Sequence, residues 1–210
     1  MIRIAVADDH AVVRSGLKQI LSEESDFTVT GEARSAEELL NLLSNRPVDV
    51  AVVDISMPGR SGLDVLADIA RRYPLVRVLV LSMHPEDQFA TRALKAGAAG
   101  YLTKESAPEE LVRAVRKVYS GRKYVSSHLA ESLAEKVAGS DQGSLHASLS
   151  EREFEVLRYL AEGMTVGMIA TRLSLNVKTV STYKSRLLGK LGMKSIAELT
   201  RYAVEQKLIE

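Results

Sequence analysis

The fold is decided by residues 48–62, which read VDVAVVDISMPGRSG. The apolar run at 50–53 is short and rich in β-branched residues, which is typical of a strand buried on both faces of a parallel sheet. The run ends in the carboxylate of Asp54, and a proline and two glycines mark the turn that follows. Ligands and reacting groups collect at the carboxyl ends of such strands. Asp54 is therefore either a structural cap for the turn or a reactive group, and the rest of the chain must decide.

Outward from this stretch, apolar strand patterns alternate with amphipathic helices. The spacing predicts strands at 2–7, 27–33, 50–54, 76–82 and 98–102, and helices at 12–21, 35–46, 62–72, 86–96 and 106–120. Capping boxes, a serine followed three residues later by a glutamate, open two of these helices at Ser35 and Ser106. Strands alternating with helices predict parallel strands joined by right-handed crossovers. We therefore expect an α/β domain with a five-stranded doubly wound sheet in the flavodoxin-like order.

The remainder of the chain has a different pattern. A short helix is expected at 129–138, followed by small, polar, breaker-rich residues that indicate a linker. From the capping box at Ser150 onward the pattern is helical, with helices expected at 151–162, 166–173, 177–191 and 195–207. Two helices joined by a tight turn, the second of them basic, indicate a helix-turn-helix domain. The predicted division is a first domain at 1–121, a linker at 122–147 and an all-α four-helix domain at 148–210.

Composition excludes several classes of protein. The chain has 210 residues, a net charge of +1 and no cysteine, so it has neither a disulfide framework nor a thiol nucleophile nor a zinc finger. No signal-peptide pattern and no apolar run of about 20 residues is present, which predicts a cytoplasmic protein that does not contact the membrane. Charge is uneven along the chain, because residues 178–194 hold five basic side chains and no acid: Lys178, Lys184, Arg186, Lys190 and Lys194.

Polar side chains occur at four strand ends of the predicted sheet. Asp8 and Asp9 follow the first strand, Asp54 ends the third, Ser82 ends the fourth and Lys104 follows the fifth. Each has a structural explanation as a cap, a turn hydroxyl or a solvated lysine. Together, however, they converge on one sheet edge, where three carboxylates repel one another unless a cation joins them. Oxygen ligands favour Mg²⁺, and a carboxylate beside Mg²⁺ and a lysine predicts phosphoryl transfer to Asp54.

The basic helix at 177–191 also has two explanations. It is either one member of a structural bundle with a solvated basic face, or a helix that contacts nucleic acid. Hydroxyl and basic side chains on its exposed face suit the major groove of DNA, because hydroxyls contact bases or phosphates and cations neutralise phosphates.

Residues 1–120 resemble the receiver domain of two-component response regulators. The matching signals are Asp8-Asp9, Asp54 with Met57-Pro58-Gly59 and Gly62, Ser82, the run from Ala96 to Tyr101, and Lys104. The resemblance implies that a sensor histidine kinase is the phosphodonor and that Asp54 is the phosphoacceptor. It implies that Asp9, Asp54 and the backbone carbonyl of Ser56 hold Mg²⁺, with Asp8 contributing through water. It further implies that Lys104 contacts the phosphoryl group, and that Ser82 and Tyr101 change position as the switch.

Residues 149–193 resemble a LuxR-type helix-turn-helix domain, so the whole chain is similar to the NarL/FixJ family. The matching signals include Leu149–Glu153, Ala161–Met164, Ile169-Ala170, Lys178-Thr179-Val180 and Lys190-Leu191-Gly192. The resemblance implies double-stranded DNA as a partner, a homodimer formed through the last helix, and DNA contacts from Lys178, Thr179, Ser181, Thr182, Lys184, Ser185 and Arg186. The stretch 178–184 is closest to virulence- and fimbria-type regulators. Thr165–Met168, Ser181 and Tyr183 depart from the family pattern, so no operator sequence is carried over.

The expected function is a phosphorylation-switched transcription regulator that is not a turnover enzyme. One alternative is a Mg²⁺-dependent hydrolase with Asp54 as nucleophile. Phosphatases of the haloacid dehalogenase type need a second aspartate two residues further on, where this chain has Ser56. The other alternative is a regulator that binds DNA constitutively through a degenerate receiver.

Overall fold

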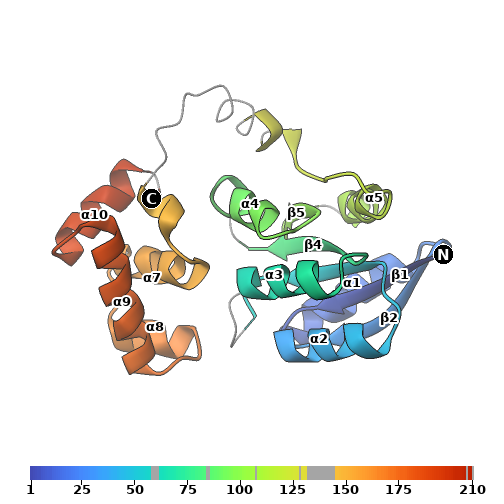
Figure 1. The fold of residues 1–210 in the computed structure, drawn as a ribbon, viewed down its shortest axis with the longest axis horizontal. Helices are drawn as coiled ribbons and strands as arrows, with labels where there is room; N and C mark the ends of the chain where they lie inside the picture. The colour runs from blue at the N-terminus through green and yellow to red at the C-terminus, as the bar shows by residue number, and fades with distance from the viewer. Residues whose placement is uncertain are drawn as a thin grey trace. The chain divides into compact units, whose positions relative to one another are not determined.

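The structure is a computed structural model, and it describes residues 1–57, 62–83, 86–106, 108–127, 129–131, 145–206 and 208–209. The chain divides into two compact units, Met1–Ala138 and Gly139–Glu210 (Figure 1). Each unit has its own core and is described by itself. No helix within the described ranges combines the length and the apolar character that a membrane crossing requires.

The first unit is built on a five-stranded parallel sheet. Its strands are β1 (Ile2–Ala7), β2 (Phe27–Ala33), β3 (Val50–Asp54), β4 (Arg77–Ser82) and β5 (Gly100–Thr103), in the order β2-β1-β3-β4-β5. The predicted order is confirmed. Every residue of β3 is buried, as a central strand covered on both faces requires. Strand β5 starts two residues later than predicted, because the Ala98 N–H still bonds to the Ala93 carbonyl (2.9 Å) in the turn that ends the preceding helix.

Helices cover both faces of this sheet (Figure 1). They are α1 (Ala11–Ser22), α2 (Ala36–Asn45), α3 (Gly62–Arg72), α4 (Glu86–Lys95) and α5 (Pro108–Tyr119). Helix α1 contacts α5, whereas α3 contacts both α2 and α4. One core cluster joins α1 and α5 to strand residues such as Ile4, Val52 and Leu79, all of which are fully buried or nearly so. These two helices therefore form one layer against the sheet.

The capping box predicted at Ser35 is only half formed. The Ser35 hydroxyl accepts the Glu38 N–H (3.2 Å), but the Glu38 carboxylate accepts the N–H of Arg34 (2.9 Å) instead of that of Ser35. The Glu38 carboxylate also accepts a bond from the Arg34 guanidinium (2.6 Å), which explains why it reaches one residue further back. At the start of α5, Pro108 is the first helical residue, where a missing N–H costs nothing.

The second unit is entirely helical. It contains a 3₁₀ turn η1 (Leu145–Ser148) and the helices α7 (Glu151–Ala161), α8 (Val166–Arg172), α9 (Val177–Leu191) and α10 (Ile196–Glu205). The capping box at Ser150 and Glu153 is complete. Between α8 and α9, Ser174 has a φ of 53° and the Asn176 side chain caps α9 by accepting the Lys178 N–H (2.8 Å). Helix α9 contacts both α7 and α8, and this short turn sets the direction in which α9 leaves α8.

The segment predicted as a linker begins on the surface of the first unit. Tyr124 forms an isolated parallel bridge with Gly100 of β5, and Leu129 is buried at 1% exposure. Only 129–131 of the helix predicted at 129–138 lie within the described residues. Residues 132–144, which make up half of the predicted linker at 122–147, lie outside them, as do Pro58 and Gly59 of the first motif.

Candidate functional site

The carboxyl edge of the sheet brings three ionisable side chains together. Asp8 follows β1, Asp54 ends β3 and Lys104 follows β5. The Lys104 ammonium donates to Oδ2 of Asp54 (2.6 Å) and forms an ion pair with Oδ2 of Asp8 (2.7 Å). Both carboxylates are 1% exposed and the lysine side chain is 9% exposed. One buried cation therefore lies between two buried anions, and this trio carries a net negative charge.

The two oxygens of each buried carboxylate have different contacts. Oδ1 of Asp54 accepts the Ser56 N–H (2.8 Å), and Oδ1 of Asp8 accepts the His10 N–H (2.8 Å). These are the local turn contacts that a structural cap would make. Oδ2 of each residue instead lies next to Lys104. Asp54 can therefore cap the turn through Oδ1 and react through Oδ2.

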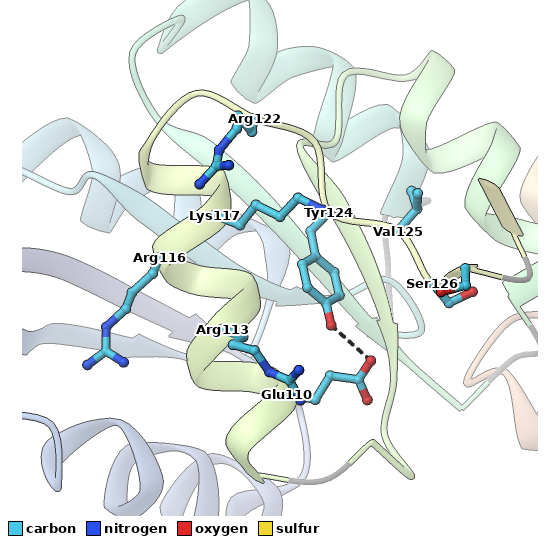
Figure 2. Close-up of a pocket in the computed structure, with 9 residues that line it drawn as sticks. Glu110, Arg113, Arg116, Lys117, Arg122, Tyr124, Val125 and Ser126 are labelled. Atoms are coloured by element: carbon cyan, nitrogen blue, oxygen red, sulfur yellow. Dashed lines mark hydrogen bonds between the residues drawn. The ribbon is translucent and has the colours of Figure 1, made fainter.

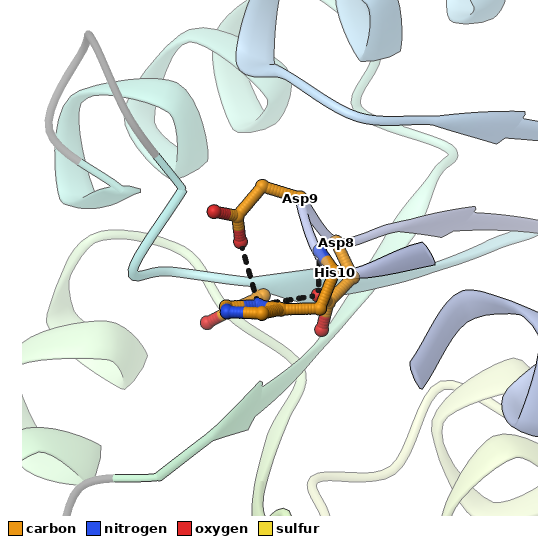
Figure 3. A group of neighbouring side chains, drawn as sticks. Asp8, Asp9 and His10 are labelled. Atoms are coloured by element: carbon orange, nitrogen blue, oxygen red, sulfur yellow. Dashed lines mark hydrogen bonds and ion pairs between the residues drawn. The ribbon is translucent and has the colours of Figure 1, made fainter. Parts of the chain in front are cut away.

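Asp9 and His10 complete a cluster able to hold a cation. The ligand atoms of Asp8, Asp9, His10 and Asp54 all lie within 4.8 Å of one another. Figure 3 shows the His10 ring between the carboxylates, with Nδ1 at 3.0 Å from Asp9 Oδ1 and 3.2 Å from Asp8 Oδ1. Asp8 Oδ2 and Asp9 Oδ1 are both buried, the first in ion-pair contact with Lys104 (2.7 Å) and the second beside His10. A cluster of carboxylate oxygens that carries more negative than positive charge fits a divalent metal ion, so this is an acidic pocket suited to one.

Burial and pairing shift two pKa values in this pocket. Burial raises the pKa of Asp54 above its ordinary value, and this effect outweighs the lowering by the bond from Lys104. Burial lowers the pKa of Lys104, but the bonds to Asp54 and Asp8 outweigh it, so that pKa is raised. Lys104 therefore stays charged at neutral pH, and the Asp54 oxygens are more basic than those of an exposed aspartate.

Ser82 adjoins the trio, and Tyr101 lies in β5, three residues before Lys104. Ser82 ends β4, one residue beyond the partner of Asp54 in the strand pairing, and its carbonyl accepts the Lys104 N–H (2.8 Å). Its side chain is fully buried. Tyr101, in the middle of β5, is also fully buried. All of the receiver-type site residues predicted from the sequence therefore lie at or beside one sheet edge.

The exposed face of α9 carries the second set of predicted residues. Lys178, Thr179, Ser181, Thr182, Ser185 and Arg186 are exposed and Lys184 is half-buried, whereas Val180, Leu187 and Leu191 are buried against the rest of the unit. The Thr182 and Ser185 hydroxyls donate to helix carbonyls of Lys178 (2.9 Å) and Ser181 (3.1 Å). Their oxygens remain at the surface as acceptors.

Lys190 has a different role from the other cations of α9. Its ammonium donates to the Glu153 carboxylate (2.6 Å), which is 4% exposed. It thereby joins α9 to the capping box of α7. The local excess of positive charge noted in the sequence is thus partly structural.

Two contacts of the acidic pocket were not predicted from the sequence. One is that of His10, although its position directly after two aspartates is a usable signal. The Arg14 guanidinium donates to the Asp8 carbonyl (2.6 Å) and lies 3.8 Å from Glu32. A basic residue one turn into α1 gave no such signal, because the contact depends on how the helix lies against β1 and β2.

Comparisons with known proteins agree with this geometry. The response regulator receiver domain matches residues 4–116, and the luxR family of bacterial regulatory proteins matches residues 147–203. Response regulator UvrY of Escherichia coli (strain K12) is 38% identical over 209 residues, which cover 99% of this chain and 96% of UvrY. Response regulator GacA of Pseudomonas aeruginosa is 38% identical over 211 residues, which cover 100% of this chain and 99% of GacA.

Solved structures give the same result. RcsB from Salmonella enterica serovar Typhimurium, bound to promoter rprA in the presence of the phosphomimetic BeF₃⁻, matches with a TM-score of 0.64 and 29% identity, covering 96% of this chain and 97% of that one. A structure of two RcsB dimers bound to two parallel DNAs matches with a TM-score of 0.60 and 29% identity, over 97% of this chain and 98% of that one. The similarity expected to virulence- and fimbria-type regulators stays a prediction. With an acidic receiver pocket and a LuxR-type helix-turn-helix both present, the chain belongs to the NarL/FixJ family of two-component response regulators.

Proposed function

We propose that Asp54 accepts a phosphoryl group from a phosphohistidine of a sensor histidine kinase, and that this controls sequence-specific DNA binding by α9. The observation that carries the proposal is the buried trio of Asp8, Asp54 and Lys104 at the carboxyl edge of β3. A nucleophile needs a charged partner within contact distance that does not block attack. Lys104 meets this requirement, because it contacts one oxygen of Asp54 from the end of β5.

In the transfer step, one carboxylate oxygen of Asp54 forms a bond to phosphorus as the bond from phosphorus to the histidine nitrogen breaks. The imidazole keeps the electron pair of the broken bond and takes up a proton. Lys104 offsets the charge on the phosphoryl oxygens, while the Ser56 N–H keeps the carboxylate oriented (2.8 Å). The aspartyl phosphate later loses its phosphoryl group to water. The protein therefore reacts with its own phosphoryl group and is not a turnover enzyme.

The cation proposed for the pocket is Mg²⁺. Asp9, Asp54 and the Ser56 backbone carbonyl would hold it, with Asp8 contributing through water. Support comes from the ligand set, which is rich in carboxylate oxygen, and from the short distances among the ligand atoms of Asp8, Asp9 and Asp54, all within 4.8 Å of one another. When bound, Mg²⁺ neutralises charge that develops on the phosphoryl oxygens.

The proposed output is a change at Ser82, whose carbonyl accepts the Lys104 N–H, and at Tyr101 in the strand that leads to Lys104. The Ser82 hydroxyl would hydrogen-bond the phosphoryl group and Tyr101 would move with it. The phosphoryl group interacts more favourably with the changed positions of Ser82 and Tyr101 than with the original ones. Such a difference in interaction free energy is the thermodynamic requirement for a switch. Both residues are fully buried, so a change in either must be transmitted through packed neighbours.

The proposed target is double-stranded DNA, read by the exposed face of α9. Lys178, Thr179, Ser181, Thr182, Lys184, Ser185 and Arg186 are the residues assigned to DNA contact. Support comes from their exposure and from the RcsB dimers seen on DNA. We also propose a homodimer on DNA, with α10 as the contact between subunits, and a cytoplasmic location, where the genome and kinase domains are accessible.

The test is phosphoryl labelling of the full chain by a small phosphodonor in the presence of Mg²⁺. Asp54→Asn is expected to abolish the label, because an amide cannot form the aspartyl phosphate. The matched control is Asp68→Asn on α3, an aspartate that pairs with Arg71 instead of lying in the pocket. It is expected to be labelled like the unchanged protein. A label that survives Asp54→Asn would place the acceptor elsewhere.

A further inference from the structure

The first residues after α5 pair with the edge of the sheet. The Tyr124 N–H donates to the Ala99 carbonyl (2.9 Å), and the Tyr124 carbonyl accepts the Tyr101 N–H (3.1 Å). Tyr124 thus forms a one-residue parallel bridge beside β5, with Gly100 as its partner. The chain that leads toward the DNA-binding unit is therefore held by the same strand that carries Tyr101.

The Tyr124 side chain is held by α5. Figure 2 shows its hydroxyl directed at Glu110, where it donates to the carboxylate (2.9 Å). The Lys117 ammonium lies 5.3 Å from the centre of the ring, within range of a cation–π contact. The ring borders an open cleft of about 660 Å³ between α5 and residues 122–127, so one side of it is not packed against the core.

The bridge leaves no room between the two backbones. A Cβ atom on Gly100 would lie 2.8 Å from the Tyr124 carbonyl oxygen and 2.9 Å from its Cβ. Those are backbone and near-backbone atoms, which cannot turn aside as the end of a flexible side chain can. A shift of β5 toward Tyr124 must therefore displace the segment.

This bridge is also the shortest strand pairing of the unit. The four pairings within the sheet each join four to six residue pairs, whereas Tyr124 joins one. Two backbone hydrogen bonds form it, and one side of the Tyr124 ring faces the cleft. Elements with few bonds and few packed neighbours open first. When β5 moves, the pairing between Tyr124 and Gly100 is therefore expected to break before the longer pairings of the sheet.

We propose that Tyr124 is a positioning residue of the phosphorylation switch, and that phosphorylation of Asp54 loosens its bridge to β5. The two ends of β5 explain the link. Lys104 follows the strand and contacts Asp54, and the N–H of Tyr101 belongs to the bridge. A phosphoryl group bonded to Asp54 displaces the Lys104 ammonium from its present 2.6 Å contact and draws the Ser82 hydroxyl toward the new oxygens. This moves β5, and residues 122–127 are released from the first unit. This inference rests on the proposed function, because it requires phospho-Asp54.

Amide hydrogen exchange of the full chain tests the proposal, with and without acetyl phosphate and Mg²⁺. The amides of Tyr101 and Tyr124, which form the bridge, are expected to exchange at least several-fold faster once Asp54 is phosphorylated. The amides of β1 serve as the internal reference and should be unchanged. The extent of phosphorylation is measured on the same samples by intact-mass spectrometry.

Two variants make the test independent of the phosphodonor. Gly100→Ala is expected to push Tyr124 off β5, so both amides should exchange fast in either state and phosphorylation should no longer change DNA affinity. Gly16→Ala, in α1, is the matched control, because nothing lies within 4 Å of the added methyl. Tyr124→Phe removes the hydroxyl that donates to Glu110 and keeps the ring, and should give a smaller increase in exchange. Tyr119→Phe, on an exposed tyrosine of α5, should give none.

The outcomes separate this inference from the proposed function. Absence of a phosphoryl group on Asp54 would contradict the proposed function itself. A stoichiometric phosphoryl group on Asp54 with unchanged exchange at Tyr101 and Tyr124 would overturn the role of Tyr124 alone. So would a Gly100→Ala protein whose bridge amides exchange fast while its DNA affinity still responds fully to phosphorylation.

Discussion

The acidic pocket of the first unit and the basic face of α9 hold their charges in opposite ways. In the pocket, Lys104 contacts two carboxylates that are each 1% exposed. On α9, Lys178, Lys184 and Arg186 have no acidic partner among the described residues, and two of the three are exposed to solvent. Paired buried charges are part of the fold, whereas unpaired exposed charges are available to another molecule. The cost of removing each charge should therefore differ greatly.

The largest effect on stability is expected for Lys104→Met. Removing the shared cation leaves two buried carboxylates unpaired, which costs about 3–5 kcal/mol of unfolding free energy at neutral pH. Urea denaturation followed by circular dichroism measures it. Lys95→Met, at the exposed end of α4, is the control and should change stability by less than about 0.5 kcal/mol. Equal stability of the two variants would mean that the trio is not held as a buried ion-paired unit.

A smaller effect is expected for Lys190→Met, which lies on α9 but is paired. Burial raises the pKa of Glu153, but the bonds from Lys190 and Ser150 outweigh burial and hold that pKa below its ordinary value. The pair therefore stabilises the fold above about pH 4.5 and loses this contribution as the pH falls through the pKa of the folded state. We expect Lys190→Met to lower the free energy of unfolding by about 1–2 kcal/mol near neutral pH. We also expect the stability of the variant to change less than that of the unchanged protein as the pH falls.

Thermal unfolding of Lys190→Met between about pH 3 and pH 7 measures both quantities, since the relevant carboxylate titrates in that range. The salt dependence of DNA binding should be the same as in the unchanged protein, since the Lys190 ammonium pairs with Glu153 of α7 and not with DNA. A large fall in the salt dependence with no loss of stability would assign Lys190 to DNA instead.

The smallest effect on stability is expected for Lys178→Met and Arg186→Met. Neither cation has an acidic partner among the described residues, so each change should alter the unfolding free energy by less than about 0.5 kcal/mol. DNA affinity should nevertheless fall, and the slope of log affinity against log salt should drop by about one for each phosphate contact removed. Fluorescence anisotropy at several salt concentrations checks this. An unchanged slope in both variants would exclude these residues from phosphate contact.

The pocket was predictable because strand order is governed by general rules. Once the strands alternate with helices, Asp8, Asp54 and Lys104 must meet at one edge. What the sequence could not show is that Lys104 contacts both acids, or that His10 lies between Asp8 and Asp9. Those contacts depend on side-chain directions that the pattern of apolar residues does not encode.

The ends and pairings of elements were less predictable. The Glu38 carboxylate accepts hydrogen bonds from Arg34 and not from the Ser35 N–H, and this depends on the conformation of one flexible side chain. Tyr124 lies in a stretch rich in polar residues, and its bridge to Gly100 joins positions 24 residues apart in the chain (124 − 100). Similarly, the pairing of Lys190 with Glu153 depends on how α9 packs against α7. Contacts between distant segments leave no periodic signal in the sequence.

The most direct test of the account is the binding of genomic DNA fragments by the full chain, with and without a phosphodonor and Mg²⁺, in the unchanged protein and in Asp54→Asn. We predict that phosphodonor raises the affinity for a defined set of fragments in the unchanged protein, and that Asp54→Asn does not respond. Equal affinity with and without phosphodonor, in a sample whose Asp54 is phosphorylated, would contradict the claim that this carboxylate controls α9.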